Sequence, residues 1–188
     1  VKALTEALMI VGVMMSFATT SRPASGSEHH LSHYFEITGI VNGEKYLAHG
    51  VDVAYSTVIT ARIREEILKK GAPSVQFVPE RDFYEAKIKE LYGESVGEGC
   101  IALQDRIGNY KKDRIPAYNE KWSEISEILS EMPSGEEIEK MLALAELDVS
   151  ELYDTYGEKK INDAVLYAKD LKDRYTVLWL NYDMRCEG

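Results

Sequence analysis

All four histidines of the chain lie within its first 49 residues. His29, His30 and His33 share one short stretch, and His49 follows soon after. His29 and His33 are spaced i, i+4, so on a helix they share a face while His30 points elsewhere. Neutral imidazoles suit Zn²⁺, Ni²⁺ or Fe²⁺, and a catalytic site adds a third protein ligand and an open position. The pattern therefore indicates a metal site.

The competing interpretation is that these histidines are structural or merely exposed. A single His is more often one of these than a ligand, but four in one region and none afterwards is less easily accidental. We expect a helix–turn–helix to bring His29 and His49 together, with His30 as a supporting or surface group. The nearby carboxylates that could complete the ligand set are Glu28, Glu36 and Asp52.

The hydrophobic pattern predicts the helices that must position these residues. A helix over 27–38 would carry His29 and His33, capped by Ser25 or Ser27, with Glu28 completing a capping box to Ser25. Asn42 and Gly43 predict a turn. Apolar residues at helical spacing then predict a long helix over 46–70, with His49 near its start.

The remainder of the chain also has helical character. Ser134 and Glu137 predict a capping box at one helix start. The final segment, 173–182, has β-branched and aromatic residues that favour a strand, but its neighbours favour a helix, which we assign. The helices expected after residue 80 cover 83–92, 94–107, 110–132 with Pro116 as a kink, 135–146, 150–155, 158–169 and 173–182. The sequence thus predicts an all-α helical bundle over residues 1–188.

The apolar run at residues 7–18 requires a separate interpretation. It lies behind Lys2 and is too short to span a bilayer. A signal peptide would place positive charge at the edge of the run, where Glu6 stands instead. We therefore expect residues 1–18 to form a helix that is buried on all sides.

The composition narrows the class of protein. The net charge is −10, from 32 acidic and 22 basic side chains, so no basic surface is predicted for nucleic acid or for an anionic membrane. The two cysteines, Cys100 and Cys186, are far apart and lack the spacing of metal ligands. A disulfide framework is not expected, and a reducing cytoplasm is the expected location.

The stretch from Ser21 to Tyr34, Ser-Arg-Pro-Ala-Ser-Gly-Ser-Glu-His-His-Leu-Ser-His-Tyr, resembles the signature of the sn-glycerol-1-phosphate dehydrogenases. These belong to the iron-containing alcohol dehydrogenase and glycerol dehydrogenase superfamily. Its metal-binding layout is His-x-x-x-His followed by His-Gly, which matches His29, His33 and His49-Gly50. The segment from Ala164 to Leu178 also resembles the end of the bacterial branch.

The resemblance implies a two-domain enzyme of which residues 1–188 are the C-terminal, all-helical domain. An N-terminal nucleotide-binding domain, which would bind NADH or NADPH, and an Asp that is the third metal ligand are missing from this chain. His29 and His49 match the two metal-binding histidines, and His33 would lie near the substrate and relay a proton. Arg22, with Ser25 and Ser27 in the same loop, is the candidate for binding the phosphate of a substrate.

The implied reaction is the reduction of dihydroxyacetone phosphate to sn-glycerol 1-phosphate, a step of phospholipid biosynthesis. The metal, Zn, Ni or Fe, would polarise the carbonyl and the cofactor would deliver hydride. We expect this chain alone to be inactive and to bind metal weakly. The alternatives are a glycerol dehydrogenase for a non-phosphorylated polyol, a dehydroquinate synthase, whose motif differs, and a non-catalytic acidic helical module. Self-association through the run at 7–18, giving a homo-oligomer, is a further expectation.

Overall fold

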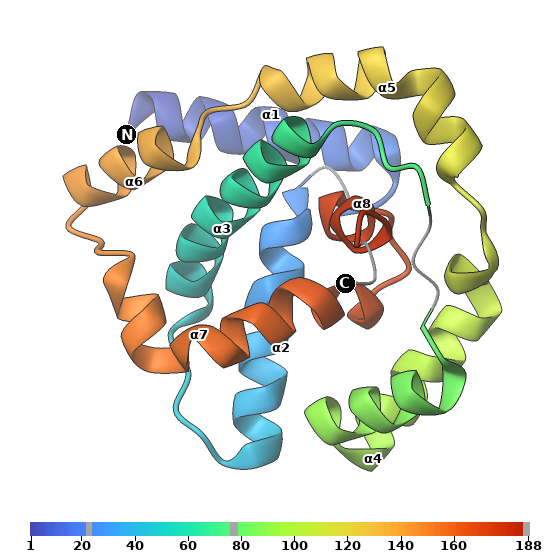
Figure 1. The fold of residues 1–188 in the computed structure, drawn as a ribbon. Helices are drawn as coiled ribbons and strands as arrows, with labels where there is room; N and C mark the ends of the chain where they lie inside the picture. Colours follow the sequence, from blue (N-terminus) through green and yellow to red (C-terminus); the bar gives the residue numbers. More distant parts are fainter. Residues whose placement is uncertain (22–23, 76–78, 186–188) are drawn as a thin grey trace.

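The computed structural model describes residues 1–21, 24–75 and 79–185. In this part of the chain every regular element is a helix, which confirms the all-α prediction (Figure 1). The helices are α1 (Lys2–Ala18), α2 (Ser27–Asn42), α3 (His49–Lys70), α4 (Arg81–Ile107), α5 (Ile115–Ser130), α6 (Gly135–Leu144), α7 (Ser150–Tyr167) and α8 (Val177–Asp183), with short 3₁₀ turns η2 (Asn109–Lys111) and η3 (Ala168–Leu171).

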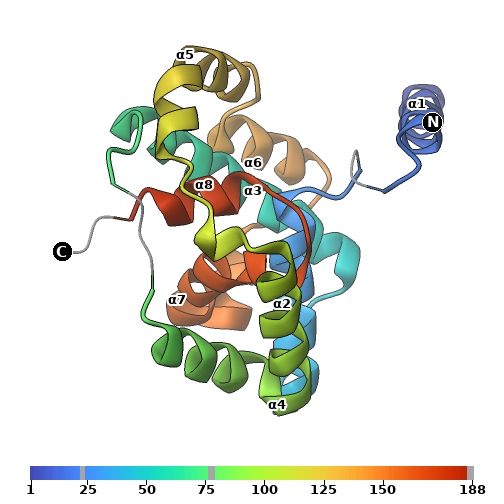
Figure 2. The ribbon, with the colours of Figure 1, turned by 90° about the vertical axis from the view of Figure 1, so that its right-hand side faces the viewer.

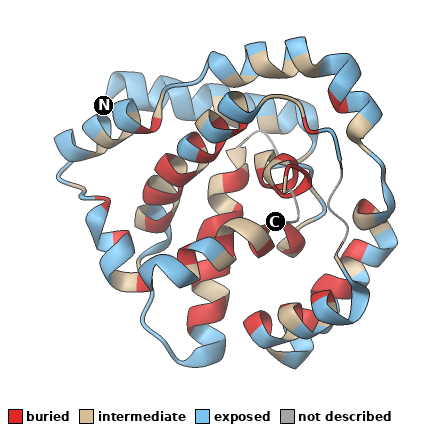
Figure 3. Ribbon diagram, in the orientation of Figure 1, coloured by how far each residue is buried: buried red, intermediate tan, exposed pale blue. Residues whose placement is uncertain are grey.

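Helix α1 corrects the prediction that residues 1–18 are buried. The helix forms, but it has no buried residue, and Leu8 and Phe17 are among its exposed apolar side chains. Figure 2 shows α1 standing away from the other helices, and Figure 3 shows it without any buried position. A helix that is apolar on all sides is normally buried, but the apolar pattern does not specify which surface covers it.

Helices α2 and α3 form the hairpin that carries the histidines, and they lie side by side (Figure 1). Helix α2 ends at Gly43, whose φ of 65° is the left-handed conformation that favours glycine. The hairpin is fixed to α7 by Tyr156, whose ring stacks on Phe35 with centroids 4.1 Å apart. The Leu47 amide also donates a 2.9 Å hydrogen bond to the Tyr156 hydroxyl. The connection between α2 and α3 is thus held by a residue distant in sequence.

Most predicted helix boundaries agree with the structure. The capping box of Ser134 and Glu137 is present. The breaks expected near residues 93 and 156–157 are found at Gly93 and Gly157, with φ of 74° and 69° inside α4 and α7. The last segment contains a helix, as assigned. Pro116, however, lies in the first turn of α5, where proline fits without producing a kink.

The predicted capping of α2 is wrong. The N-cap residue is Gly26, and no side chain caps the helix by accepting a hydrogen bond. Glu28 supplies only the reverse half of a capping box, because its carboxylate accepts a 2.8 Å hydrogen bond from the Gly26 amide. Ser27 is instead a buried first residue of the helix. This leaves the loop serines available for other contacts.

The cysteines and the apolar helices were also subjects of prediction. Cys100 is a buried, free thiol, and Cys186 lies outside the described residues. In residues 1–21, 24–75 and 79–185, no helix combines the length and apolar character needed to cross a bilayer.

Candidate metal centre

Three imidazoles converge where α2 faces the start of α3. His29 and His33 lie one turn apart on α2, with ring centroids separated by 6.4 Å. His49 is the first residue of α3, and its ring centroid lies 5.5 Å from that of His29 and 5.2 Å from that of His33. The expected meeting of His29 and His49 across the hairpin is therefore found.

Each converging ring has a neighbour at its Nδ1 atom. The Nδ1 of His29 lies 2.8 Å from a carboxylate oxygen of Glu28. The Nδ1 of His49 lies 3.0 Å from the hydroxyl oxygen of the buried Ser32. Metal-ligating histidines characteristically use one ring nitrogen for such a contact, which fixes the ring and leaves the other nitrogen for the metal. The arrangement leaves Nε2 of both rings to serve as ligands.

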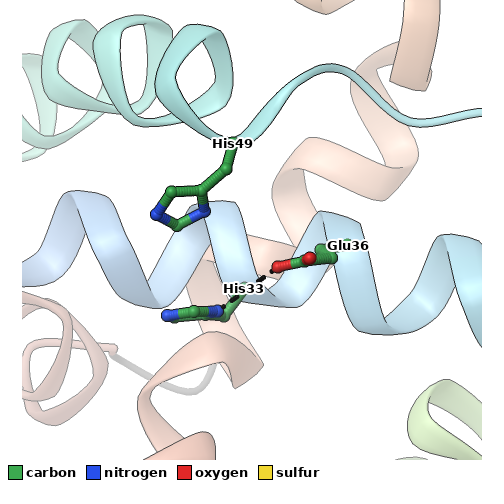
Figure 4. A group of neighbouring side chains, drawn as sticks. All are labelled: His33, Glu36 and His49. Carbon is green, nitrogen blue, oxygen red and sulfur yellow. Dashed lines mark ion pairs between the residues drawn. The ribbon is translucent and has the colours of Figure 1, made fainter.

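A carboxylate joins this group. His33, Glu36 and His49 each offer a ligand atom, and these atoms lie within 4.8 Å of one another. Figure 4 shows the His33 and His49 rings one above the other, with Glu36 to one side. The Nδ1 of His33 lies 3.5 Å from Glu36 Oε2. Of the three candidate carboxylates, Glu36 is thus the one that lies with two imidazoles as a potential ligand group.

The other two candidate carboxylates have different roles. Burial acts to raise the pKa of Glu28, but hydrogen bonds from His29 and from backbone amides outweigh it, and the net pKa is lowered. Glu28 is therefore an anionic support for His29. Asp52 is fully buried, and its two oxygens accept hydrogen bonds of 2.8 and 2.9 Å from the Tyr156 hydroxyl. Burial raises the pKa of Asp52 to about 7.

His30 is a supporting residue and not a surface one. It is fully buried, and its Nδ1 lies 2.8 Å from the Gly26 carbonyl oxygen at the helix start. Burial lowers the pKa of His30 to about 4, so the ring is neutral at physiological pH. The residue thus stabilises the first turn of α2, which carries His29.

The predicted substrate-binding residues have mixed outcomes. Arg22 lies outside the described residues. Ser25 lies beside the cluster and accepts hydrogen bonds from two cations that the sequence analysis did not identify, Lys172 and Arg174. In the sequence, the one indication of these cations was the charged stretch from Lys172 to Arg174, which lies in the segment that resembles the C-terminal end of the bacterial family members.

Comparison with known proteins identifies similar sequences along the chain. A glycerol-1-phosphate dehydrogenase [NAD(P)+] of Bacillus licheniformis is 28% identical over 185 residues, which cover 95% of this chain and 33% of the relative. The protein of the same name from Halalkalibacterium halodurans is 44% identical over 71 residues, 37% of this chain and 18% of the relative. One from Korarchaeum cryptofilum is 40% identical over 81 residues, 39% of this chain and 26% of the relative.

The chain spans about a third of the length of the curated relatives that match it almost throughout. No family model matches the chain. No solved structure matches it either. Over almost all of its length, the chain is thus similar in sequence to the C-terminal part of curated glycerol-1-phosphate dehydrogenases.

Proposed function

We propose that this chain is the metal- and substrate-binding part of an NAD(P)H-dependent oxidoreductase that reduces dihydroxyacetone phosphate to sn-glycerol 1-phosphate. The names of the relatives support the class of reaction. The observation that carries the proposal is the convergence of His29, His33 and His49, because it brings three imidazole rings and one carboxylate into one small region.

The donor set fits a divalent transition metal. Imidazole nitrogen with carboxylate oxygen is a common combination for Zn²⁺, Ni²⁺ and Fe²⁺. His29 and His49 would hold the ion through Nε2, while Glu28 and Ser32 fix their rings from the opposite side. Such an ion, when bound, polarises a substrate carbonyl as a Lewis acid.

His33 has a different role in this proposal. Its ring lies against His49 on one side, and its Nδ1 is near Glu36. Its other nitrogen can exchange a proton with the substrate oxygen, directly or through water, while Glu36 orients the ring. In this proposal Ser25, in the loop before α2, and Ser27, the first residue of α2, belong to the substrate-binding side of the site.

The proposed reaction requires further groups besides the residues described above. The resemblance assigns the nicotinamide cofactor and an Asp ligand to a domain that residues 1–188 do not include. The chain by itself is therefore expected to bind metal weakly and not to catalyse the reaction. A glycerol dehydrogenase-type domain for a non-phosphorylated polyol is the nearest alternative, and a non-catalytic helical module is the more distant one.

Titration of the metal-free chain with Zn²⁺ or Ni²⁺ by calorimetry tests this proposal. His29→Ala and His49→Ala should each weaken binding by about tenfold or more, because each removes a ligand. Glu127→Ala, which removes an exposed carboxylate from α5, is the control and should bind as the wild type does. If the two histidine variants bind metal as the wild type does, the metal centre is wrong and the helical-module alternative gains support.

Self-association is a second part of the proposal. Helix α1 exposes Leu4, Leu8, Met9, Val13 and Phe17. Contiguous exposed apolar surface of this kind commonly marks an interaction site. We expect this surface to pair with a second copy of the chain. Light scattering that shows only monomer at high concentration would contradict this expectation.

A further inference from the structure

Two cations lie beside the imidazole cluster, on the segment that joins η3 to α8. Lys172 donates a 3.3 Å hydrogen bond from Nζ to the Ser25 hydroxyl. Arg174 donates a 2.9 Å bond from Nη1 to the Ser25 carbonyl and a 3.3 Å bond from Nη2 to the Ser21 hydroxyl. Both cations are half-buried. The C-terminal segment therefore brings two positive charges onto the loop that leads into α2.

These cations have no carboxylate within ion-pair distance among the described residues. This is unusual for a chain with 32 acidic and only 22 basic side chains. Burial lowers the pKa of Lys172, and the neighbouring charge of Arg174 lowers it further, while Glu28 acts in the opposite direction. Glu28 itself is occupied by His29 and by the Gly26 amide. Adjacent like charges in a half-buried position cost free energy unless an anion joins them.

Several buried polar atoms in the same region have no hydrogen-bond partner among the described residues. They are the Nε of Arg174, the Nε2 of His30 and the Oγ1 of Thr176. His30 is fully buried in the first turn of α2, which follows the loop residue Ser25 that both cations bond. Buried polar atoms are normally paired, so a group of unpaired ones beside two cations indicates a polar ligand. An arginine with a free N–H is suited to the fork-like recognition of phosphate oxygens.

The position of the two cations relative to the imidazoles is equally specific. Both cations bond Ser25, which lies two residues before Ser27, the first residue of α2, and His29 follows in the first turn of that helix. The Ser25 hydroxyl lies between the cationic segment and the first turn of α2. A ligand bound by the cations would therefore extend toward His33 and His49.

We infer that Lys172 and Arg174, together with the Ser25 hydroxyl, bind the phosphate group of a small phosphomonoester whose reacting carbon lies at the imidazole cluster. This inference rests on the proposed function and specifies how that site selects a phosphorylated substrate. A purely structural role, in which the cations only tie the loop to the C-terminal segment, is the competing explanation. The glycerol dehydrogenase alternative has no need for such a pair.

The test is titration of the chain with sn-glycerol 1-phosphate, inorganic phosphate and glycerol, followed by calorimetry with EDTA present. Wild type should bind both phosphates and should not bind glycerol. Lys172→Gln and Arg174→Gln should each weaken phosphate binding by about tenfold or more, since each removes a charged hydrogen bond. Arg174→Lys, which keeps the charge and loses the fork, should fall between wild type and Arg174→Gln.

The matched controls are Lys159→Gln and Arg106→Gln, which remove the same charges at exposed positions and should bind phosphate as the wild type does. Circular dichroism checks that each variant is folded. If Arg174→Gln does not fold, Lys172→Gln decides the question, because within the described part of the chain Lys172 Nζ makes a single, long hydrogen bond. Equal phosphate binding by wild type and Lys172→Gln, or no binding by wild type, would overturn the inference. Because EDTA keeps metal out of this titration, its result is independent of the metal titration.

Discussion

Two pairs of charged residues lie close together near the end of the chain, and they differ in how their charges are balanced. Lys169 and Asp170 are fully buried, and the Lys169 ammonium lies 2.8 Å from the Asp170 carboxylate. Lys172 and Arg174 are half-buried and have no carboxylate within ion-pair distance in the described residues. A pair that is closed by its own counter-charge is structural, whereas a pair left open to solvent is suited to a ligand.

The closed pair is also satisfied by its surroundings. The Tyr110 hydroxyl lies 2.7 Å from Asp170 and 2.8 Å from the Lys169 ammonium. The ammonium also lies 3.8 Å from the ring centroid of Tyr182 and 4.8 Å from that of Trp179, within cation–π range. Burial lowers the pKa of Lys169 and raises that of Asp170, and their mutual attraction opposes both changes. No further partner is required here.

The largest effect is expected from breaking the closed pair. Lys169→Met removes the counter-charge and leaves a buried carboxylate, which typically costs about 3–5 kcal/mol of stability. Urea denaturation followed by circular dichroism measures this loss. Lys159→Met is the control, because the Lys159 side chain is 89% exposed, and it should change stability by about 0.5 kcal/mol or less. A loss below about 1 kcal/mol for Lys169→Met would remove the distinction between the pairs.

The fold was largely predictable because its signals are local. Helical spacing of apolar residues located most elements, and glycine marked the interruptions at Gly93 and Gly157. The burial of α1 was not predictable, because an apolar run shows that a helix is favoured but not which surface covers it. The cap of α2 was also wrong, since Ser25 contacts the C-terminal segment instead of the helix start.

In the candidate site, contacts between residues close in sequence could also be predicted, and contacts between distant residues could not. The meeting of His29 and His49 could be predicted, because one short hairpin connects them. The involvement of Lys172 and Arg174 could not, because their hydrogen bonds to Ser25 join residues 147 and 149 positions apart. Sequence reasoning considered only Arg22, a loop cation that lies outside the described residues, and the fold adds two cations from the other end of the chain. Only the tertiary structure reveals that neither cation has a carboxylate within ion-pair distance in the segments that the structure describes.

A smaller effect on stability is expected at Asp52. Its carboxylate accepts hydrogen bonds from Tyr156, and among the described residues no cation lies within ion-pair distance of it. Burial raises the pKa of Asp52 from 3.8 to about 7. When the pKa of a carboxyl group is higher in the folded state than in the unfolded state, the unfolded chain releases its proton first as the pH rises. Folding is therefore most stable below the unfolded pKa, and this stability is lost as the pH rises to the folded pKa. Stability should therefore decline between about pH 4 and pH 7, by on the order of 2–4 kcal/mol from this group.

Asp52→Asn tests this expectation, because the amide oxygen can still accept from Tyr156 but cannot ionise. The variant should match the wild type near pH 4 and exceed it in stability at about pH 8. Urea denaturation across this range measures both proteins. If the stabilities of the two proteins change in parallel with pH, burial does not raise the pKa of Asp52. Asp52 would then behave like the half-buried charges of Lys172 and Arg174 and not like the buried pair.

The smallest effect is expected from Lys172→Gln in the absence of phosphate. The substitution removes one 3.3 Å hydrogen bond to Ser25 but also removes repulsion from Arg174, so stability should change by about 0.5 kcal/mol or less. Urea denaturation with and without phosphate separates the two roles of the residue, because ligand that binds only the folded state adds to stability. Added phosphate should stabilise wild type more than Lys172→Gln. A loss comparable to that of Lys169→Met without phosphate would instead show that Lys172 holds the fold, and the two pairs would then be alike.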